Sequence, residues 1–483
     1  MRCRSWWILS MLAVAGAFCL PATYYVSPAG SDGGSGSSAQ PWRTLQHAAD
    51  QVQAGDVVLV RSGSYAGFRS KSSGGAGQPV QFRAEAGASV VIHTVGPDNW
   101  HGSVINIENH DWWLVDGFEV TGATGSAGID VREADHVVIR NCHCHHNQKW
   151  GIFTGFAEAF TAEFNECAYS GEEHGIYHSN SGDDAVIRHN YCHHNRGCGI
   201  QINADPSMGG DGICADARVE YNVVTANGAG GGAGINLASV RTSRITNNLI
   251  FGNQAGGIAM WDDGQGTQWG CRNNLIAHNT VHMPSSARWA LNMINGSTGN
   301  QVINNILIHD GSRGGLETDT GSLDGLVCDY NIMIRISLDD AFLTLAAWQS
   351  GYGQDVHSAS RTAAELFINP GGDHHLLESA WAVDHGLTLG AVVDDLDGVA
   401  RPRGAASDIG CYERAAGALV GDLNRDGAVD DAAVILLGPQ VRFELNRVKG
   451  LFPNIPVESI NPQDYGLVRG ENVLNHAIEL AGK

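Results

Sequence analysis

Positively charged residues are scarce in this chain of 483 residues, and lysine is the scarcest of them. Lysine occurs only at Lys71, Lys149, Lys449 and Lys483, and 51 Asp and Glu residues outnumber 29 Lys and Arg residues. The net charge of −22 excludes nucleic acid as a partner, because its phosphates require a basic surface. An acidic protein that binds an acidic polysaccharide would need local Arg or Lys residues, or bound cations, to offset the repulsion.

Aromatic residues and long apolar runs are also sparse. Aromatic residues make up 7% of the chain, whereas glycine contributes 63 residues, a balance typical of turn-rich β structure. One apolar run extends from Trp6 to Leu20 and is too short to cross a bilayer. With Arg2 and Arg4 before it and Ala22 after it, this run predicts a signal peptide over residues 1–22. We therefore expect a secreted, extracellular protein with no membrane contact after cleavage.

Cysteine does not supply a complete disulfide framework. Of the 11 cysteines, Cys3 and Cys19 fall in the predicted signal peptide, which leaves an odd number. Cys144, Cys167 and Cys192 are interpreted as small core residues, in keeping with the burial habits of free thiols. Cys214 and Cys271 lie in two insertions of the repeat described next, so a bridge could join them.

A short pattern returns along residues 138–318. Its mark is an apolar residue at the end of a small-residue stretch, with gaps of 24, 24, 35, 23, 33 and 25 residues between copies. These residues are Ile152, Ile176, Ile200, Ile235, Ile258, Leu291 and Leu316. Brief β runs at a period of about two dozen residues, without a helical period, predict a parallel β-helix. Each repeat is expected to contain two short strands and two turns.

Asparagines form a second column, at the end of the first strand of each repeat. The column contains Asn165, Asn190, Asn222, Asn248, Asn279 and Asn305. We expect these residues to tolerate a positive φ in a tight turn and to bond the coils above and below. Two residues further on, a stacked core is predicted from Cys144, Cys167, Cys192, Val224, Ile250, Val281 and Leu307. The two long gaps contain insertions at 204–216 and 262–271, which in solenoids emerge on one face, often the binding face.

The segments on either side of the repeat complete the predicted domain. A strand is expected over 23–28, a short helix over 44–52 that covers the open end of the solenoid, and another strand over 55–60. Tyr24-Tyr25-Val26-Ser27-Pro28, Trp42-Arg43-Thr44-Leu45-Gln46 and Gly55-Asp56 with Arg61-Ser62-Gly63-Ser64-Tyr65 resemble the opening of secreted right-handed parallel β-helix proteins of the pectate-lyase-like superfamily. Phe367-Ile368-Asn369-Pro370, Asp395-Leu396-Asp397-Gly398 and Asp408-Ile409-Gly410-Cys411-Tyr412-Glu413 look like its closing segments.

The resemblance implies an all-β, right-handed parallel β-helix over residues 23–413, with an N-terminal capping helix. It also implies an Arg or Lys base and Ca²⁺ held by a cluster of aspartates. The dense Asp-Asp-Gly-Trp-Asp type of calcium motif is not found in this sequence, where Asp183-Asp184 has different neighbours.

After a linker at 414–420 the composition changes, and residues 421–483 predict a small α-helical, EF-hand-like module. Oxygen ligands stand at loop positions 1, 3, 5 and 9, with Gly427 at the sharp turn. The predicted calcium ligands are Asp422, Asn424, Asp426 and Asp430. The segment resembles the first calcium repeat of a dockerin, which implies a cohesin-type scaffold partner. Position 12 is Ala433, which supplies no carboxylate, and a second loop near Asn461 has lost most ligands.

Candidate catalytic residues stand three positions before each core Ile or Leu. This column reads Lys149, Glu173, Gly197, Gly232, Ala255, Arg288 and Arg313. Large charged groups at both ends of a run of small ones predict the floor of a groove. Coils about 4.8 Å apart would let Lys149 and Glu173 touch and would leave about 19 Å between Glu173 and Arg288. An ordinary surface ion pair is the simpler alternative.

A row of outward side chains follows each core residue. It contains Phe153, Tyr177, Gln201, Asn236, Ala259, Asn292 and Glu317, and two positions further on Asn203, Trp261 and Asp319. Amide and aromatic groups in rows suit sugar hydroxyls and sugar faces, although a merely solvated sheet would read similarly. Acidic residues of the two insertions are expected to converge beside this row: Asp205, Asp211, Asp216, Asp262 and Asp263. Paired carboxylates serve either glycoside hydrolysis or calcium binding.

Histidines cluster at two places in the repeat, at 143–146 and 189–194. His145 and His193 would lie two coils apart, about 10 Å by strand spacing, whereas zinc ligands lie about 2 Å from the metal. This spacing disfavours one shared zinc, and an outward polar row is the preferred interpretation. His174, beside Glu173 and near Tyr177, remains the histidine with a candidate catalytic role.

The sequence favours an exported enzyme that acts on a polysaccharide. For a lyase acting on a uronate, Lys149 or His174 is the candidate base, Tyr177 a candidate acid, and Arg288 and Arg313 candidate carboxylate binders. For a glycoside hydrolase, Glu173 would pair with Asp205 or Asp262. A non-catalytic carbohydrate-binding solenoid is the third alternative. The remaining predicted substrate contacts are Gln201, Asn203, Asn236 and Trp261. Calcium is expected in the C-terminal loop, and a second calcium site in the groove is an alternative left open.

Overall fold

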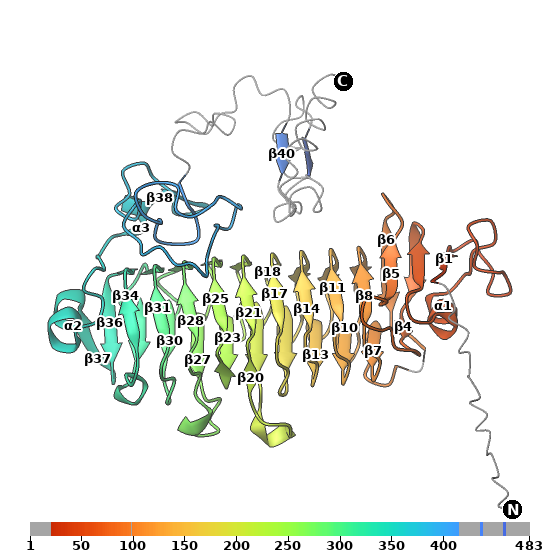
Figure 1. Ribbon diagram of the computed structural model, residues 1–483, viewed down its shortest axis with the longest axis horizontal. Coiled ribbons are helices and arrows are strands. Elements are labelled where there is room, and N and C mark those ends of the chain that lie inside the picture. The colour runs from red at the N-terminus through yellow and green to blue at the C-terminus, as the bar shows by residue number, and fades with distance from the viewer. Residues whose placement is uncertain (1–20, 98, 415–434, 438–456, 460–483) are drawn as a thin grey trace, which may run out of the picture.

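The structure is a computed structural model that describes residues 21–97, 99–414, 435–437 and 457–459. From residue 23 to about 344 the chain winds into a parallel β-helix whose coils stack along one axis (Figure 1). Each coil contributes strands to three long sheets, here called sheets 1, 2 and 3 in the order in which the chain passes through them, and these enclose one apolar core.

Sheet 1 consists of β1 (Thr23–Val26), β2 (Val57–Val60), β5 (Val80–Ala84), β8 (Trp113–Asp116), β11 (Val138–Arg140), β14 (Thr161–Glu163), β17 (Val186–Arg188), β21 (Arg218–Glu220), β25 (Arg244–Thr246), β28 (Leu275–Ala277), β31 (Gln301–Ile303) and β34 (Val327–Asp329). Sheet 2 consists of β3 (Gly63–Ala66), β6 (Val90–Thr94), β9 (Glu119–Val120), β12 (His143–His145), β15 (Glu166–Ala168), β18 (Tyr191–His193), β22 (Val223–Thr225), β26 (Leu249–Phe251), β29 (Thr280–Met283), β32 (Ile306–His309) and β35 (Ile332–Met333). Sheet 3 consists of β4 (Phe68–Arg69), β7 (Ile105–Glu108), β10 (Ala127–Arg132), β13 (Trp150–Gly155), β16 (Ile176–Ser179), β19 (Ile200–Asn203), β23 (Ala233–Ala238), β27 (Gly256–Trp261), β30 (Leu291–Met293), β33 (Leu316–Thr318), β36 (Arg335–Leu338) and the antiparallel β37 (Ala341–Thr344).

The predicted file of core residues is confirmed. Ile152 pairs in register with Ile176, and the same register continues through the other five members, all of which are fully buried in sheet 3. The second predicted core column, from Cys144 to Leu307, is also fully buried and lies in sheet 2. A period of about two dozen residues thus identified vertical neighbours correctly.

The prediction of two strands in each repeat was wrong, because each regular coil has three. The missed boundary is between sheets 1 and 2, where β11 ends at Arg140 and β12 begins at His143. Asn141 turns the chain there with a φ of 54°, in the left-handed region. Because a single left-handed residue makes this corner, the sequence shows no run of turn residues there. The strands of sheets 1 and 2 were therefore interpreted as one strand.

The asparagine column is a hydrogen-bonded ladder, but its predicted positive φ belongs to the preceding residue. Tyr221 has a φ of 57°, whereas Asn222 is absent from the left-handed region and fully buried. The Asn222 amide nitrogen donates to the Ile187 carbonyl (2.9 Å) and to Asn248 Oδ1 (3.0 Å), so the expected bonding between coils is confirmed. A second ladder, missed in the sequence, follows the next corner through Asn195, Asn227 and Asn253.

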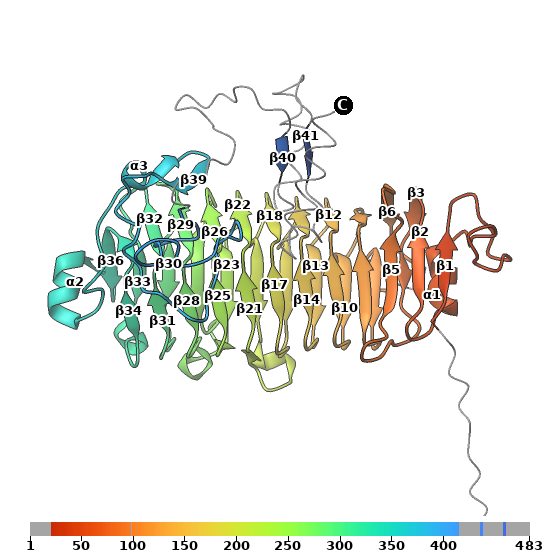
Figure 2. The ribbon, with the colours of Figure 1, turned by 45° about the horizontal axis from the view of Figure 1, so that its top comes forward.

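The two ends of the solenoid have different coverings. The expected first strand is β1, and the expected helix is α1 (Leu45–Gln51), where His47 N donates to the Thr44 hydroxyl (3.2 Å). At the other end lie α2 (Leu345–Tyr352), α3 (Ala363–Leu366), β38 (Phe367–Asn369) and β39 (Asp373–Leu376). Residues 363–414, here called the strap, fold back over sheet 2 and the corner beside it (Figures 1 and 2).

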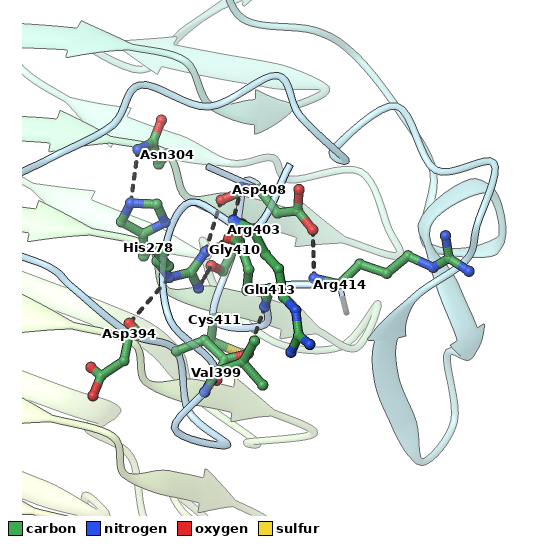
Figure 3. A network of polar contacts seen from close by, with 12 residues as sticks. His278, Asn304, Asp394, Val399, Arg403, Asp408, Gly410, Cys411, Glu413 and Arg414 are labelled. Carbon is green, nitrogen blue, oxygen red and sulfur yellow. Dashed lines mark hydrogen bonds and ion pairs between the residues drawn. The ribbon is translucent and has the colours of Figure 1, made fainter. Parts of the chain in front are cut away.

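A buried ion pair holds the strap together. Arg401 Nη1 lies 2.7 Å from Glu413 Oε2, and Arg401 also donates to the Gly410 carbonyl (2.8 Å) and to Asn247 Oδ1 of a coil (3.3 Å). Figure 3 shows neighbouring strap residues beside His278 and Asn304, which project from two adjacent coils. The strap is therefore anchored to the side chains of the residues that turn the corner, because Asn247, His278 and Asn304 have positive φ values of 53°, 54° and 59°.

The two insertions project from the same edge of sheet 3, as expected (Figure 1). The first contains the short helix η1 (Pro206–Met208) and β20 (Cys214–Ala215), and the second contains η2 (Thr267–Trp269). β20 pairs with β24 (Val240–Arg241) of the coil that lies between the insertions, and Arg241 Nη2 donates to the Gln268 carbonyl (2.9 Å). A Cβ on Gly212 would lie only 2.8 Å from the Trp269 ring, so the two insertions are packed against each other.

Several predictions concern thiols and termini. Cys214 and Cys271 are both free and buried, so the suggested bridge is absent. Among the described residues, the longest helices fall well short of the length and apolar character that a membrane crossing demands. The predicted signal peptide and the four predicted calcium ligands at 422–430 lie outside the described residues. Within 421–483 the described parts are two paired strands, β40 (Ile435–Leu437) and β41 (Val457–Ser459), where helices were expected.

Within the solenoid, one more short helical turn, η3 (Thr320–Ser322), follows β33.

Candidate active site

The outer face of sheet 3 carries the predicted row of outward side chains. Phe153 pairs in register with Tyr177, Tyr177 pairs with Gln201 in the next coil, and Gln201 pairs with Asn236 in the coil after that. The row continues through Ala259, Asn292 and Glu317. Alternation along each strand turns these side chains outward, because the residues on both sides of them fill the core.

Lys149 and Glu173 are neighbours in adjacent coils, as predicted. Glu173 N donates to the Lys149 carbonyl (3.2 Å), and Gly197 N donates to the Glu173 carbonyl (2.6 Å). The Lys149 ammonium lies 5.3 Å from the centroid of the Trp150 ring, and Trp150 Nε1 donates to Glu173 Oε2 (2.9 Å). The indole thus contacts both the cation and the anion and fixes the carboxylate.

An aromatic cluster begins at Trp150. Its ring stacks on Phe153 at 4.4 Å, Phe153 meets Tyr177 edge-on at 5.4 Å, and the Arg132 guanidinium lies 4.5 Å above Phe153. Arg132 is in turn paired with the buried Asp130 (2.8 Å). Sequence reasoning missed Trp150, Arg132 and Asp130, although extending the outward row to the coils before Phe153 would have found Asp130.

His174 is buried against this cluster in one defined tautomer. Cys198 N donates to His174 Nδ1 (2.9 Å), so the lone pair is on Nδ1 and the proton is on Nε2. Nε2 lies 3.6 Å from Glu173 Oε2. Burial lowers the pKa of His174 to about 4, which keeps the ring neutral. With its one lone pair already engaged, His174 is suited to orient Glu173 rather than to remove a proton.

Three carboxylates act electrostatically on the Tyr177 phenol. Burial raises the pKa of Tyr177, and the negative charges of Asp263, Glu173 and Asp205 raise it further, which places all three near the hydroxyl. The phenol is therefore protonated at neutral pH and can donate a proton. Two of these carboxylates come from the insertions, so the expected convergence of acidic groups occurs at this point.

Asn203 joins the two insertions. Its Nδ2 donates to Asp263 Oδ2 (2.7 Å), and its Oδ1 accepts from Asp205 N (3.0 Å). Burial raises the pKa of Asp263, and the nearby charges of Asp205 and Asp262 raise it further. Asp205 and Asp263 thus form a pair of carboxylates that repel each other, a donor set that a divalent cation would fit.

Asp262, the residue chosen from the sequence, has a different place. Its side chain is buried and accepts hydrogen bonds from Gly264 N (3.0 Å), Gly266 N (3.0 Å) and Asn295 Nδ2 (2.9 Å). The two glycine contacts fold the second insertion, the Asn295 contact ties it to the next coil, and Asp263 is the residue that reaches Asn203. Nothing in the loop sequence distinguishes Asp262 from the adjacent Asp263, so the sequence alone did not show which of the two faces Asn203.

The predicted substrate contacts are partly tied to one another. Asn236 Nδ2 donates to Gln201 Oε1 (2.7 Å), and Trp261 Nε1 donates to Asn236 Oδ1 (3.1 Å). Gln201 and Asn236 are 7% and 8% exposed, so they offer little surface, whereas Trp261 is half-buried. This chain of amides holds Trp261 in place across three coils.

Arg288 and Arg313 lie on the same edge as Lys149, further along the solenoid. Both are exposed, and Arg288 N donates to the Ala255 carbonyl (2.8 Å), which confirms the predicted column there. On the adjacent row, Asn292 Nδ2 donates to Glu317 Oε2. The cluster around Tyr177 does not include either arginine.

An acidic hollow lies where the first insertion meets sheet 3. It is lined by Glu133, Asp135, Phe156, Glu158, Ser181, Asp183, Gly210 and Asp211. Burial raises the pKa of Asp183, and Asp211 raises it further. Asp135 and Asp183 each use one oxygen on a backbone N–H, from Glu158 (2.9 Å) and Ala215 (2.7 Å). In the part of the chain that the structure describes, no three His, Cys, Asp or Glu side chains are positioned to hold a metal ion together.

This fold, with charged and aromatic side chains in register on one sheet, defines a parallel β-helix protein of the pectate-lyase-like class. The chain belongs to the family described as Pel9A-like, right handed beta helix region, whose model matches residues 24–300.

Individual proteins resemble parts of the chain or its fold. Pectate lyase PEL9 of Emericella nidulans is 29% identical over 150 residues, which cover 28% of this chain and 35% of that protein. The uncharacterized protein YwoF of Bacillus subtilis is 32% identical over 129 residues, 25% of this chain and 28% of that one. The chain thus matches about a third, or less, of the length of these curated relatives. The crystal structure of pectate lyase Pel9A superposes with a TM-score of 0.58 at 17% identity, covering 82% of this chain and 98% of the other, which shows the fold alone.

Proposed function

We propose that the protein is a secreted polysaccharide lyase that cleaves a uronate-containing glycan on the outer face of sheet 3. The observation that carries this proposal is the placement of Lys149, which the Trp150 ring holds beside Glu173 in the coil next to the Tyr177 cluster. Family membership and the partial match to a protein named pectate lyase support the substrate class.

The chemistry requires a base, an acid and a counter-charge. Lys149 acts as the neutral amine: its Nζ takes the proton from C5 of the uronate and becomes an ammonium, and the electron pair left on C5 forms the C4–C5 double bond as the C4–O4 bond breaks. The protonated phenol of Tyr177 donates to the departing O4. Glu173, fixed by Trp150 and His174, orients the sugar that bears the leaving group.

The counter-charge would come from a cation. Asp205 and Asp263 would hold Ca²⁺, and the ion would offset the charge on the substrate carboxylate. The repulsion that raises the pKa of Asp263 supports this assignment, because a bound cation relieves it. Arg288 and Arg313 would bind uronate carboxylates of neighbouring sugars, and Trp261 would stack on a sugar face.

The lyase proposal is tested by the product. Incubation with polygalacturonate, alginate and rhamnogalacturonan should yield an unsaturated product that absorbs in the near ultraviolet. Lys149→Met should abolish it, whereas Lys71→Met, which removes an exposed lysine just after β4, three strands of sheet 3 before β13, should not. Equal loss in both variants, or equal activity in both, would refute the role of Lys149.

Glycoside hydrolysis is the second candidate, favoured by the three carboxylates around Tyr177. Glu173 would act with Asp205 or Asp263 as acid and as base or nucleophile. This reaction produces reducing ends without the ultraviolet absorbance, so one digest distinguishes the two. Binding without turnover across the same glycans would indicate a carbohydrate-binding surface protein.

Two further proposals concern parts of the chain outside the described residues. Residues 1–22 would direct export, and residues 421–483 would bind Ca²⁺ through Asp422, Asn424, Asp426 and Asp430 and dock to a cohesin-type scaffold. The residue pattern of the loop is the support for both the calcium and the docking proposals.

A further inference from the structure

Sheet 2 and the corner after it carry two copies of one histidine arrangement, outside the Tyr177 cluster of sheet 3. His145 Nδ1 lies 2.8 Å from His146 Nδ1, and two coils further on His193 Nδ1 lies 2.8 Å from His194 Nδ1. In both copies the first histidine is the last residue of its strand, and the second turns the corner with a positive φ of 51° or 54°. Neither the fold nor the proposed reaction requires these side chains.

A carboxylate contacts the outer nitrogen of the first histidine in each copy. His145 Nε2 lies 3.3 Å from Glu119 Oε1, and His193 Nε2 lies 3.0 Å from Glu166 Oε1. A carboxylate at this position favours the tautomer with its proton on Nε2, which leaves the Nδ1 lone pair directed at the neighbouring histidine. Metal-binding histidines are usually oriented in this way, with the second nitrogen donating to a carboxylate.

The second histidines are oriented by a shared aromatic residue. Tyr169, in the coil between the two copies, stacks on His146 at 4.8 Å and on His194 at 5.1 Å. Both imidazoles are exposed at their edges, so an ion can reach them.

We propose that each histidine pair binds one divalent transition-metal ion through its two Nδ1 atoms, which gives two sites in one chain. Two nitrogens 2.8 Å apart, each about 2.0 Å from a metal, subtend an angle of about 90° at the ion. That is the angle between adjacent ligands in square-planar and octahedral complexes, whereas tetrahedral geometry would separate the nitrogens by about 3.3 Å. The sites are therefore suited to Ni²⁺ and Cu²⁺, with water completing the coordination.

The experiment is a calorimetric titration with Ni²⁺ of the full chain without a polyhistidine tag, in excess Ca²⁺ to fill oxygen-ligand sites. The native protein should bind two more Ni²⁺ ions than the double variant His146→Asn/His194→Asn, and each single variant should lose one. Asn is the replacement because it tolerates a positive φ. Glu119→Gln should weaken one site by about 10- to 100-fold and leave the other unchanged.

His136→Asn is the matched control. His136 is also exposed, has a φ of 56° and stacks on an aromatic residue, Trp112 at 3.8 Å, but it has no adjacent histidine. This variant should retain both ions. Cu²⁺ bound to the native protein should show nitrogen hyperfine splitting from two imidazoles for each ion in electron paramagnetic resonance. If the native protein binds no more Ni²⁺ than the double variant, or if the control loses an ion, the pairs are hydrogen-bonded only and the proposal is wrong.

Discussion

Replacing one asparagine of the corner ladder should destabilise the solenoid far more than its small size implies. Asn222 is fully buried, and its side chain makes four hydrogen bonds that join three coils. Nδ2 donates to the Ile187 carbonyl (2.9 Å) and to Asn248 Oδ1 (3.0 Å). Oδ1 accepts from the backbone and side-chain nitrogens of Asn190 (2.9 and 3.0 Å).

The expected cost of Asn222→Ala is about 4 kcal/mol, from four bonds at about 1 kcal/mol each. The Asn190 N–H would also be left buried without an acceptor, which keeps the estimate from falling much below about 3 kcal/mol. The matched control is Gln301→Ala. That amide is exposed on the outer face of sheet 1, and its loss should cost at most about 0.5 kcal/mol.

The assay is urea unfolding followed by intrinsic fluorescence, together with amide hydrogen exchange. The exchange measurement is local, because the Asn190 amide loses its acceptor and should exchange faster than amides several coils away. A loss of less than about 1 kcal/mol, or uniform exchange along the solenoid, would refute the view that the ladder holds neighbouring coils together.

Three further predictions concern pH, catalysis and calcium. Burial lowers the pKa of His375, but the hydrogen bonds to Asp373 and Asp397 outweigh this effect and raise the pKa to about 10. The charged ring therefore stabilises the strap fully below about pH 6.5, the pKa of an unfolded histidine. This stabilisation is lost as the pH rises through 10. The thermal midpoint should therefore fall over that window in the native protein and stay level in His375→Gln. Because His174 has a lowered pKa of about 4, the pH profile of glycan cleavage should show no ionisation of His174 near 6.5, and a His174→Gln variant with the same acid limb would support this. Asp422→Ala should remove one calcium ion in a calorimetric titration, and unchanged stoichiometry would contradict the proposed loop.

The period of the sequence was sufficient to identify the core because vertical neighbours in a solenoid recur at nearly constant spacing. Ile152, Ile176 and Ile200 are equally spaced and share one chemical type, so the file was visible without a structure. The corner residues were not visible, because the left-handed positions hold Phe164, His189 and Tyr221, which no turn rule selects. The sequence identified the asparagine ladder at one of the two corners. It assigned the positive φ to the asparagine, whereas the residue before it has that conformation.

The site was predicted in part for the same reason. Residues in register with the core file, such as Lys149 and Tyr177, were placed correctly because the period fixes their position. In the insertions, the convergence of Asp205 and Asp263 was predicted, but the choice of Asp262 as the reactive carboxylate was not supported, because its side chain folds its own loop. The strap contacts were beyond reach, because Tyr221 and Asp394 are far apart in the chain and their hydrogen bond (2.5 Å) leaves no periodic signal.

The charge around Tyr177 connects the proposed reaction to a requirement that can be tested. The charges of Glu173, Asp205 and Asp263 act on the phenol, and Lys149, the proposed base, lies beside Glu173. Because this cluster is acidic, a uronate would be repelled unless a cation intervened, whereas a neutral glycan would not be. Chelation of Ca²⁺ should therefore abolish lyase cleavage of a uronate glycan, whereas hydrolysis of a neutral glycan, the second candidate reaction, would be spared. An Asp205→Asn/Asp263→Asn variant that still cleaves a uronate in the presence of chelator would separate the lyase reaction from this pair of carboxylates and require a different counter-charge, for which Arg132 is the nearest cation on the aromatic cluster.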